Sequence, residues 1–436
     1  MKDDVFMFKK GSYLYVEEDA NTNNIFIVKH GAVQLVYQNH RLKHNVKIAG
    51  TGDILGFISS LCGKPRTESA LAVEDSSVIV LPKNRFMEKL KRSPDMTFRV
   101  LRYFAQQLRD YDELLTSENS QGSLSPALSM FQAGSFYYKT GDVHAAYYIL
   151  SELIKHYNSD PVADSARNLI SKMSSLVNES KTVPAHEGVY RVFADKQVIF
   201  CENEPGAELF IIKKGRVKIV KQSGDSEIIL SVLSDGEIFG ELAIVSTKPR
   251  NATAISIGQT TVLPVNVPAL TKLIEKSPLI INRIFIAISR RVWFTHIRFD
   301  ALTYNRLITK MYIFLKNKLL EENISLQSTS PHSFTFGIDE LQKMTGHSDN
   351  DDDTANEMFN DPNLRFQLGD ITVLSPKALV ATARYYVARD NVNAKNVDNE
   401  RFFFQDDGEI DDEINTDDAL ETLSIVSEIE DFDFPN

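Results

Sequence analysis

Short stretches rich in Val, Ile and Leu, separated by glycines and polar turn residues, mark two parts of the chain. In the later part these stretches lie at 209–212, 217–220, 228–232 and 261–265. Runs of this length and composition predict β-strands. Several of them in succession predict a small antiparallel roll or barrel.

After these strands the apolar positions change to a helical period. Five residues lie near one stripe of the predicted helix: Leu273, Ile280, Ile284, Ile288 and Val292. Ser277 and Pro278 suit the N-cap and the first helical position. The stripe fits either the contact of a homodimer or a core within one chain.

The two parts are copies of each other. The segment IFIVKHG at 25–31 recurs as LFIIKKG at 209–215, 184 residues later. The same offset relates Gly56 to Gly240 and the run KPR at 64–66 to the run at 248–250. One register kept over so many positions indicates a duplicated domain. We place the copies at 1–118 and 183–300, each a β-roll followed by helix.

Residues 119–182, between the copies, predict a helical spacer. Within 131–173, the segments YKTGD at 138–142 and YNSDP at 157–161 resemble a single helical hairpin of the tetratricopeptide type. Such arrays need about three repeats to be stable alone. We therefore expect a structural spacer, with a peptide-docking surface as the alternative.

The net charge of −11 is concentrated at the end of the chain. Residues 406–436 contain 13 Asp and Glu and no Lys or Arg, so the rest of the chain is close to neutral. Because this segment lacks a long apolar periodicity, we expect 396–436 to be an acidic, disordered tail. It would serve either solubility or the binding of a protein partner.

The sequence predicts a reduced, cytoplasmic protein. The most apolar helical stretch, 279–294, is interrupted by four polar residues that a membrane span would exclude: Asn282, Arg283, Arg290 and Arg291. The first residues, MKDDVFMFKK, lack the apolar core of a signal peptide. Cys62 and Cys201 are too few for a disulfide framework or a cysteine metal cluster.

A candidate phosphate site lies in the second copy, at 239–253, with the sequence FGELAIVSTKPRNAT. Gly240 lets the backbone approach a ligand, and a short helix beginning near it would aim N–H groups at an anion. The Arg250 guanidinium can bind the oxygens of a cyclic phosphate. The Glu241 carboxylate can accept a hydrogen bond from a ribose 2′-hydroxyl. The alternative is that both side chains serve in a structural ion pair.

This segment closely resembles the phosphate-binding cassette of cyclic nucleotide-binding domains. The resemblance covers the whole copy, including Gly215 and Asp235-Gly236. It implies an α+β fold with two cyclic nucleotide-binding β-rolls and flanking helices. The implied ligand contacts are Phe239, Gly240, Glu241, Leu242, Ala243, Arg250, Asn251 and Ala252.

The helix that follows resembles the dimer helix of the cyclic-AMP receptor superfamily of bacterial transcription regulators. Thr295 falls on the family's adenine-contacting threonine, so the resemblance implies cAMP as the ligand in preference to cGMP. His296 takes the neighbouring position, where the family has a serine that reaches the ligand of the partner subunit. The resemblance implies no further cofactor.

The first copy departs from this pattern. The offset places Phe57 opposite Glu241 and Tyr111 opposite Thr295, while Arg66 is kept opposite Arg250. Burying a 2′-hydroxyl against Phe57 would leave it unpaired, at a cost of about 1–3 kcal/mol. We expect a degenerate roll at 1–118.

The alternative for the first copy is a second anion site, with a different phosphate compound held at Arg66 and Thr67.

Residues 301–395 resemble the winged helix-turn-helix domain of the same superfamily. The pattern predicts an amphipathic helix at 305–320, a helix and turn at 336–346, a wing at 364–373 and a last helix opening at Ser375-Pro376. The position of the recognition helix, 348–359, contains five acids and no base, and such a helix repels DNA phosphates. The acids argue against sequence-specific DNA binding. The Asp-rich run 349–353 lacks the glycine and final glutamate of an EF-hand calcium loop, so we expect no metal site.

The leading hypothesis is a regulatory protein that senses cAMP in its second roll. Binding would be transmitted to the C-terminal domain or to an unknown protein partner. The alternative is a cAMP-responsive transcription regulator that binds DNA as a dimer. An enzyme is not supported, because the Gly-x-Ser-x-Gly, P-loop and His-Glu-x-x-His motifs are absent.

Overall fold

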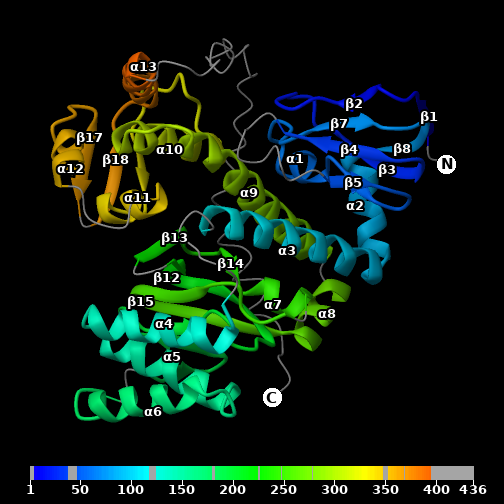
Figure 1. The fold of residues 1–436 in the computed structure, drawn as a ribbon. Coiled ribbons are helices and arrows are strands. Elements are labelled where there is room, and N and C mark those ends of the chain that lie inside the picture. Colours follow the sequence, from blue (N-terminus) through cyan, green and yellow to red (C-terminus); the bar gives the residue numbers. More distant parts are fainter. Residues whose placement is uncertain are drawn as a thin grey trace.

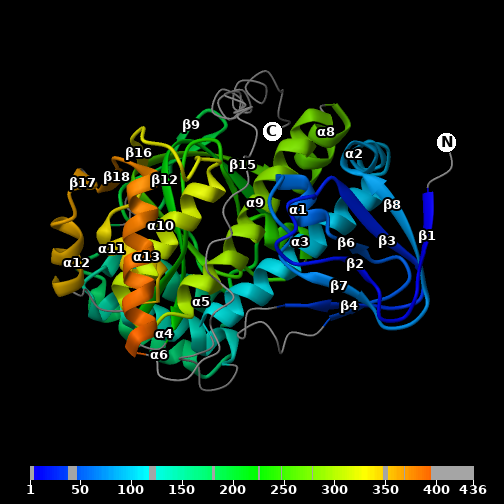
Figure 2. The ribbon, with the colours of Figure 1, turned by 90° about the horizontal axis from the view of Figure 1, so that it is seen from above.

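The computed structural model describes residues 4–37, 47–116, 124–178, 182–223, 226–246, 248–276, 278–346, 352–367 and 369–393. Helices and antiparallel sheets are mixed along the chain, as the sequence predicts. Figures 1 and 2 show a first β-roll and a C-terminal unit on opposite sides of the molecule, with the long helix α9 (Pro278–Leu302) between them. A second roll lies below α9 in the view of Figure 1.

The first roll consists of two four-stranded antiparallel sheets, in the orders β1-β8-β3-β6 and β2-β7-β4-β5. Alternate strand residues such as Ile25, Val33 and Val78 point inward and are fully buried. Its elements are β1 (Asp4–Phe8), β2 (Tyr13–Tyr15), β3 (Asn24–His30), β4 (Val33–Val36), β5 (Lys47–Ala49), β6 (Ile54–Leu55), α1 (Phe57–Cys62), β7 (Ser69–Ala72), β8 (Ser76–Pro82), α2 (Lys83–Arg92) and α3 (Pro94–Thr116).

The second roll is built around two long strands, β12 (Glu208–Ser223) and β15 (Thr253–Asn266). The sheet order is β13-β12-β15-β10-β9, with β11 on β15 and β14 on β12. The other elements are β9 (Ala185–Glu187), β10 (Tyr190–Phe193), β11 (Val198–Phe200), β13 (Ser226–Leu233), β14 (Ile238–Phe239), α7 (Glu241–Ser246) and α8 (Val267–Lys276). As predicted, α9 then begins at Pro278; Ser277 lies outside the described residues.

The structure corrects one strand boundary. The stretches 209–212 and 217–220 are not separate strands but parts of β12, which pairs with β15 on both sides of Gly215. The register shifts there, and Gly215 has a left-handed φ of 104°. A Cβ at Gly215 would lie 2.7 Å from the Gln259 carbonyl oxygen. The glycine therefore bends the strand instead of ending it.

The described part of the spacer contains three helices: α4 (Pro126–Lys139), α5 (Val143–His156) and α6 (Val162–Met173). Gly134 lets α4 approach α5 closely, because a Cβ there would lie 2.6 Å from the Leu150 side chain. The spacer contacts the second roll at β13, where Tyr137 of α4 donates to the Glu227 carboxylate, and at the turn that carries Asn203 and Glu204. Tyr148 donates to the Glu204 carboxylate at 3.1 Å and Tyr157 to the Asn203 carbonyl at 2.9 Å.

The C-terminal unit has the three-stranded sheet β16-β18-β17. Its elements are α10 (Leu307–Glu321), β16 (His332–Phe334), α11 (Ile338–Met344), α12 (Asp352–Phe359), β17 (Leu364–Gln367), β18 (Asp370–Val373) and α13 (Pro376–Asn393). They coincide with the predicted segments, with one correction. α10 is not amphipathic: none of its residues is exposed, because α9, α11, α12 and α13 all contact it. The predicted tail, 396–436, lies outside the described residues.

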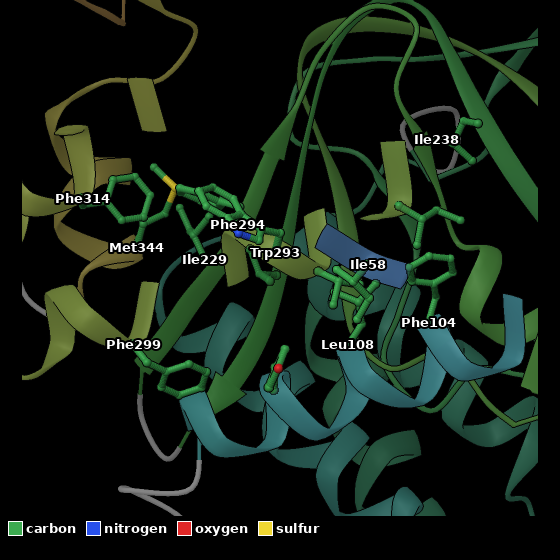
Figure 3. Packing of buried hydrophobic residues seen from close by; sticks show 14 of the residues in the cluster. Ile58, Phe104, Leu108, Ile229, Ile238, Trp293, Phe294, Phe299, Phe314 and Met344 are labelled. Carbon is green, nitrogen blue, oxygen red and sulfur yellow. The ribbon is translucent and has the colours of Figure 1, made fainter. Parts of the chain in front are cut away.

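Buried apolar side chains from both rolls, α9 and the C-terminal unit form one cluster (Figure 3). The rings of Phe294 in α9 and Phe314 in α10 lie 5.4 Å apart. In the α9 stripe, Ile284, Ile288 and Val292 are buried within the single chain. Of the two alternatives for this stripe, the structure shows the intrachain core. Among the described helices, none combines the length and apolar character needed to cross a bilayer.

Candidate functional site

The predicted cassette begins at a tight turn between β14 and α7. Gly240 occupies this turn with a left-handed φ of 77°. A Cβ at Gly240 would lie 2.8 Å from a terminal nitrogen of Arg250. Glycine is required here for both reasons, the backbone conformation and the close approach of the guanidinium.

The side chain of Arg250 is buried, with 5% of the residue exposed. Its guanidinium lies 4.1 Å from the centre of the Phe200 ring, and Nη1 donates to the Gly240 carbonyl at 2.7 Å. Burial lowers the pKa of Arg250, but a guanidinium keeps its charge. Nε has no hydrogen-bond partner in the described structure. The site thus holds a buried cation with a donor left over.

The backbone of Arg250 is fixed by the turn that carries Asn203 and Glu204. The Asn203 N–H donates to the Arg250 carbonyl at 2.9 Å, and the Arg250 N–H donates to the Glu204 carbonyl at 2.8 Å. Gly206, close to this turn, leaves room for the guanidinium, because a Cβ there would lie 2.4 Å from Nε. The same turn contacts the spacer helices, so the spacer supports the base of Arg250.

Glu241 is the first residue of α7 and is 3% exposed. One of its oxygens pairs with the Arg291 guanidinium of α9, which also donates to the Ile238 carbonyl at 3.2 Å. The other oxygen, Oε2, has no hydrogen-bond partner in the described part of the chain. The structural ion pair of Glu241 thus forms with Arg291, whereas Arg250 donates to the Gly240 carbonyl, and one buried Glu241 oxygen is left without a partner among the described residues.

All nine predicted contact residues of the second roll line one cavity: Phe239, Gly240, Glu241, Leu242, Ala243, Arg250, Asn251, Ala252 and Thr295. Seven residues complete its wall: Leu108, Asp112, Phe200, Ile219, Leu230, Ser231 and Arg291. The cavity measures only about 60 Å³, whereas ordinary ligand pockets measure about 300 Å³ or more. A ligand of ordinary size would fit here only with the walls further apart.

The helix residues predicted to face the base have partners of their own. Thr295 lines the cavity, and its hydroxyl donates to the Arg291 carbonyl one turn earlier at 2.8 Å. His296 is buried, and burial lowers its pKa to about 3, so it is neutral. Its Nδ1 lies 3.2 Å from the Tyr111 hydroxyl of α3. His296 therefore joins the helices of the two rolls.

The helices of the two rolls cross, and each one contacts the cassette of the other roll. Arg109 of α3 donates to the Pro249 carbonyl at 2.9 Å. Trp293 of α9 donates through Nε1 to the Pro65 carbonyl at 2.9 Å. Both donors and both acceptors are related by the 184-residue offset. The rolls therefore pair about an approximate twofold axis within one chain.

In the first roll, the terminal nitrogens of Arg66 and the hydroxyl of Thr67 already have protein partners, while Nε of Arg66, like Nε of Arg250, has none in the described structure. The Arg66 guanidinium donates to the Gly56 carbonyl and, at 2.8 Å, to the Asn24 carbonyl. The Thr67 hydroxyl donates to the neighbouring Glu68 carboxylate. Phe57 fills the position of the missing acid and is 2% exposed.

In the C-terminal unit, α12 contains Asp352, Asp353 and Glu357 and no Lys or Arg. Most of the run 349–353 lies outside the described residues. Among the described residues, no cluster of three or more His, Cys, Asp or Glu side chains is arranged to hold a metal ion.

Sequence reasoning missed the remaining wall residues of the cavity. The repeat itself contains a signal for Arg291, because the 184-residue offset places Gln107 opposite Arg291 and Phe57 opposite Glu241. The acid and its arginine thus change together. Leu108 and Asp112 come from the other roll, and only the crossing of α3 over α7 reveals them. Phe200, Ile219 and Leu230 are strand residues with no local motif.

The cyclic nucleotide-binding domain family model matches residues 5–93 and 190–277, which are the two rolls. The chain thus contains two segments, in tandem, that match the cyclic nucleotide-binding domain family. Among curated proteins, 101 residues are 32% identical to a CRP-like cAMP-activated global transcriptional regulator of Mycobacterium tuberculosis, covering 23% of this chain and 45% of that protein. A further 128-residue match is 25% identical to a cyclic AMP receptor protein of Thermus thermophilus, covering 29% and 59%. The chain thus spans about half the length of the curated relatives it matches.

Among solved structures, this chain is similar to a CRP/FNR-family transcriptional regulator of Thermus thermophilus. The identity is 19%, the TM-score is 0.33, and the match covers 45% of this chain and 98% of that chain.

Proposed function

We propose that the second roll binds one cyclic nucleotide, with Arg250 on the phosphate and Glu241 on the ribose 2′-hydroxyl. The observation that carries this proposal is a pair of buried atoms beside one cavity, Nε of Arg250 and Oε2 of Glu241, which have no partner in the described structure. An unsatisfied buried polar atom costs about 1–3 kcal/mol. A cyclic phosphate and a 2′-hydroxyl would supply the missing acceptor and the missing donor.

The other predicted contacts complete the proposed site. Gly240, Leu242 and Ala243 place the first turn of α7 against the phosphate, and Phe239 and Ala252 form apolar walls. Asn251 and Thr295 supply polar side chains beside the phosphate and the base. We favour cAMP over cGMP because Thr295 matches the adenine-contacting position. The names of the matched relatives, a cAMP-activated regulator and a cyclic AMP receptor protein, also favour cAMP.

We propose that α9 transmits binding to the C-terminal unit. Arg291 in α9 pairs with Glu241, and Arg298, about two turns further along, is fully buried. Arg298 donates to the carbonyls of Leu230 and Ile229, both at 2.7 Å, and to that of Met344 in α11 at 2.9 Å. A ligand that binds the free Glu241 oxygen would change the strength and geometry of the Glu241–Arg291 pair and so shift the equilibrium between two positions of α9.

The domain assignment remains a proposal: a degenerate roll at 1–118, a tetratricopeptide-like spacer at 119–182, the sensing roll at 183–300, a winged-helix-like unit at 301–395 and the tail at 396–436. Within it, the protein is a cytoplasmic regulator, not an enzyme, whose output goes through a protein partner. The described acids of α12 argue against the alternative of a cAMP-responsive DNA-binding regulator. A mobility-shift assay at low salt tests that alternative, and a site-specific complex would favour it.

The test is calorimetric titration of cAMP and cGMP into the wild type, Arg250→Ala and Arg66→Ala. Removing charge-assisted bonds to the phosphate is expected to weaken cAMP binding about 100-fold or more in Arg250→Ala. Arg66→Ala removes the offset-related arginine of the first roll and should leave the affinity within about twofold of the wild type. Absence of binding by the folded wild type would contradict the proposal.

A further inference from the structure

Helix α3 belongs to the first roll, yet it forms part of the site in the second. Figure 1 shows α3 running between the two rolls, close to α7. Its residues Leu108 and Asp112 line the cavity of the predicted cassette. Figure 3 shows Leu108 and Phe104 along the same helix, within the shared apolar cluster. The first roll therefore contributes an entire wall of a site that lies outside it.

Two side chains of α3 engage both ends of the Asn251 amide. The Nδ2 group of Asn251 donates to Oδ2 of Asp112 at 2.7 Å. Arg109 donates through Nη1 to Oδ1 of Asn251 at 3.3 Å and through Nη2 to the Pro249 carbonyl at 2.9 Å. Asn251 directly follows Arg250, so the residue next to the phosphate-binding arginine is fastened to the other roll.

Asp112 brings negative charge into a cavity whose chemistry suits an anion. Its residue is 8% exposed, and its carboxylate shares the cavity with the buried Arg250 guanidinium. A cyclic phosphate is also an anion and would need the amide donor of Asn251. Like charges repel strongly where water is excluded, so the Asp112 carboxylate and the phosphate cannot both use this donor without cost.

The small size of the cavity also indicates that α3 opposes ligand binding. At about 60 Å³ it has room for two or so water molecules, and Leu108 and Asp112 close it from the side of α3. The wall made by α3 is held by the hydrogen bonds to Asn251 and Pro249. Ligand entry needs this wall to yield.

We propose that Asp112 is an affinity-determining residue of the nucleotide site, supplied by the degenerate roll, whose carboxylate competes with the cyclic phosphate for Asn251. The first roll then acts as an internal competitor that keeps the site of the second roll closed. This inference rests on the proposed function of the second roll and adds a role for the first.

The test is calorimetric titration of cAMP into Asp112→Asn at pH 7.5. The amide keeps the shape of the side chain and removes its charge. The expected result is cAMP affinity about tenfold tighter than that of the wild type, through the loss of repulsion and of competition for Asn251. Asp112→Ser, which removes the same charge, is the second variant if the amide disturbs folding. Thermal unfolding checks both variants.

The matched control is Glu88→Gln, which removes one negative charge from an exposed side chain of α2 in the same roll. It should leave the affinity unchanged within about twofold. Equal or weaker binding by folded Asp112→Asn, with the wild type binding, would overturn this inference alone. If the wild type and every folded variant fail to bind any cyclic nucleotide, the proposed function fails as well.

Discussion

The two rolls have the same arrangement of strands and helices around the cassette. They differ in the hydrogen-bond and ion-pair partners of the cassette side chains. In each roll an arginine, Arg66 or Arg250, donates to the carbonyl of the glycine that opens the cassette helix. In the first roll the same guanidinium also reaches the Asn24 carbonyl. An arginine at this position therefore has a structural role of its own, and its presence alone does not identify a ligand site.

The acid is what separates the rolls. Among the described residues, Glu241 has a buried oxygen without a partner, whereas Phe57 in the first roll packs on the rings of Tyr103 and Phe104 at 4.9 and 5.0 Å. The partner changes with the acid, since Arg291 stands where the first roll has Gln107. A carboxylate without its arginine would be an uncompensated buried charge, so the two residues are kept together or replaced together.

The strongest test of the coupling between Glu241 and Arg291 replaces Arg291 by glutamine, the residue type that the first roll has at this position. Arg291→Gln leaves Glu241 buried without its ion-pair partner and should lower the free energy of unfolding by about 3 kcal/mol. Urea denaturation measures this change. The double variant Glu241→Gln, Arg291→Gln should be less destabilised than the two single variants together. Additive losses would break the proposed coupling of acid and arginine.

A ligand analogue sharpens the comparison at the ribose. Glu241→Gln weakens the proposed bond from the 2′-hydroxyl and should reduce cAMP affinity about tenfold, because a charged acceptor is replaced by a neutral one. With 2′-deoxy-cAMP the wild type and the variant should bind equally. The matched change in the first roll, Phe57→Leu, should leave cAMP affinity unaltered. A tenfold loss that persists with the deoxy analogue would place Glu241 elsewhere than on the ribose.

A smaller effect on cAMP affinity is expected from pH, because Asp112 of α3 lines the cavity of the second roll. Burial raises the pKa of Asp112 to about 6, so its carboxyl becomes neutral as the pH falls through this value. A neutral Asp112 no longer repels the phosphate, and cAMP affinity should rise about threefold between pH 7.5 and 5.5. The wild type and Asp112→Asn are compared by titration across this range.

Other ionisable groups surround Asp112 and must be separated from it. They are Lys221 on β12, Arg291 and Arg298 on α9, Glu202 beside them, and Arg109 and Glu113 on α3 itself. Burial raises the pKa of Glu202 to about 7, so its contribution remains in both proteins. A rise of equal size in Asp112→Asn would contradict a role for Asp112.

The fold could be predicted largely from the sequence because the apolar spacing repeats. The 184-residue register places Gly56 with Gly240 and Arg66 with Arg250, and the structure puts each pair at the same point of its roll. Local sequence signals gave a wrong strand boundary where pairing with a distant strand determines the structure. β12 continues through Gly215 because β15 pairs with it on both sides.

Half of the candidate site could be predicted, and the other half depends on assembly. Glu241, Arg250 and Thr295 carry a motif whose chemistry is local, and the cavity contains all three. Leu108 and Asp112 lie more than 120 residues before the cassette, in a helix of the other roll. No sequence pattern predicts that α3 contacts α7, because that contact depends on how the two folded rolls pack together.

The stoichiometry of cAMP binding tests the central claim most directly, because it asks whether one roll senses and the other does not. Calorimetric titration of cAMP into the wild-type chain should give one site per chain. A value of two would show that the first roll binds as well, although Phe57 stands there in place of the acid. A value of zero would show that the second roll, with its unpaired Glu241 oxygen, is not a sensor.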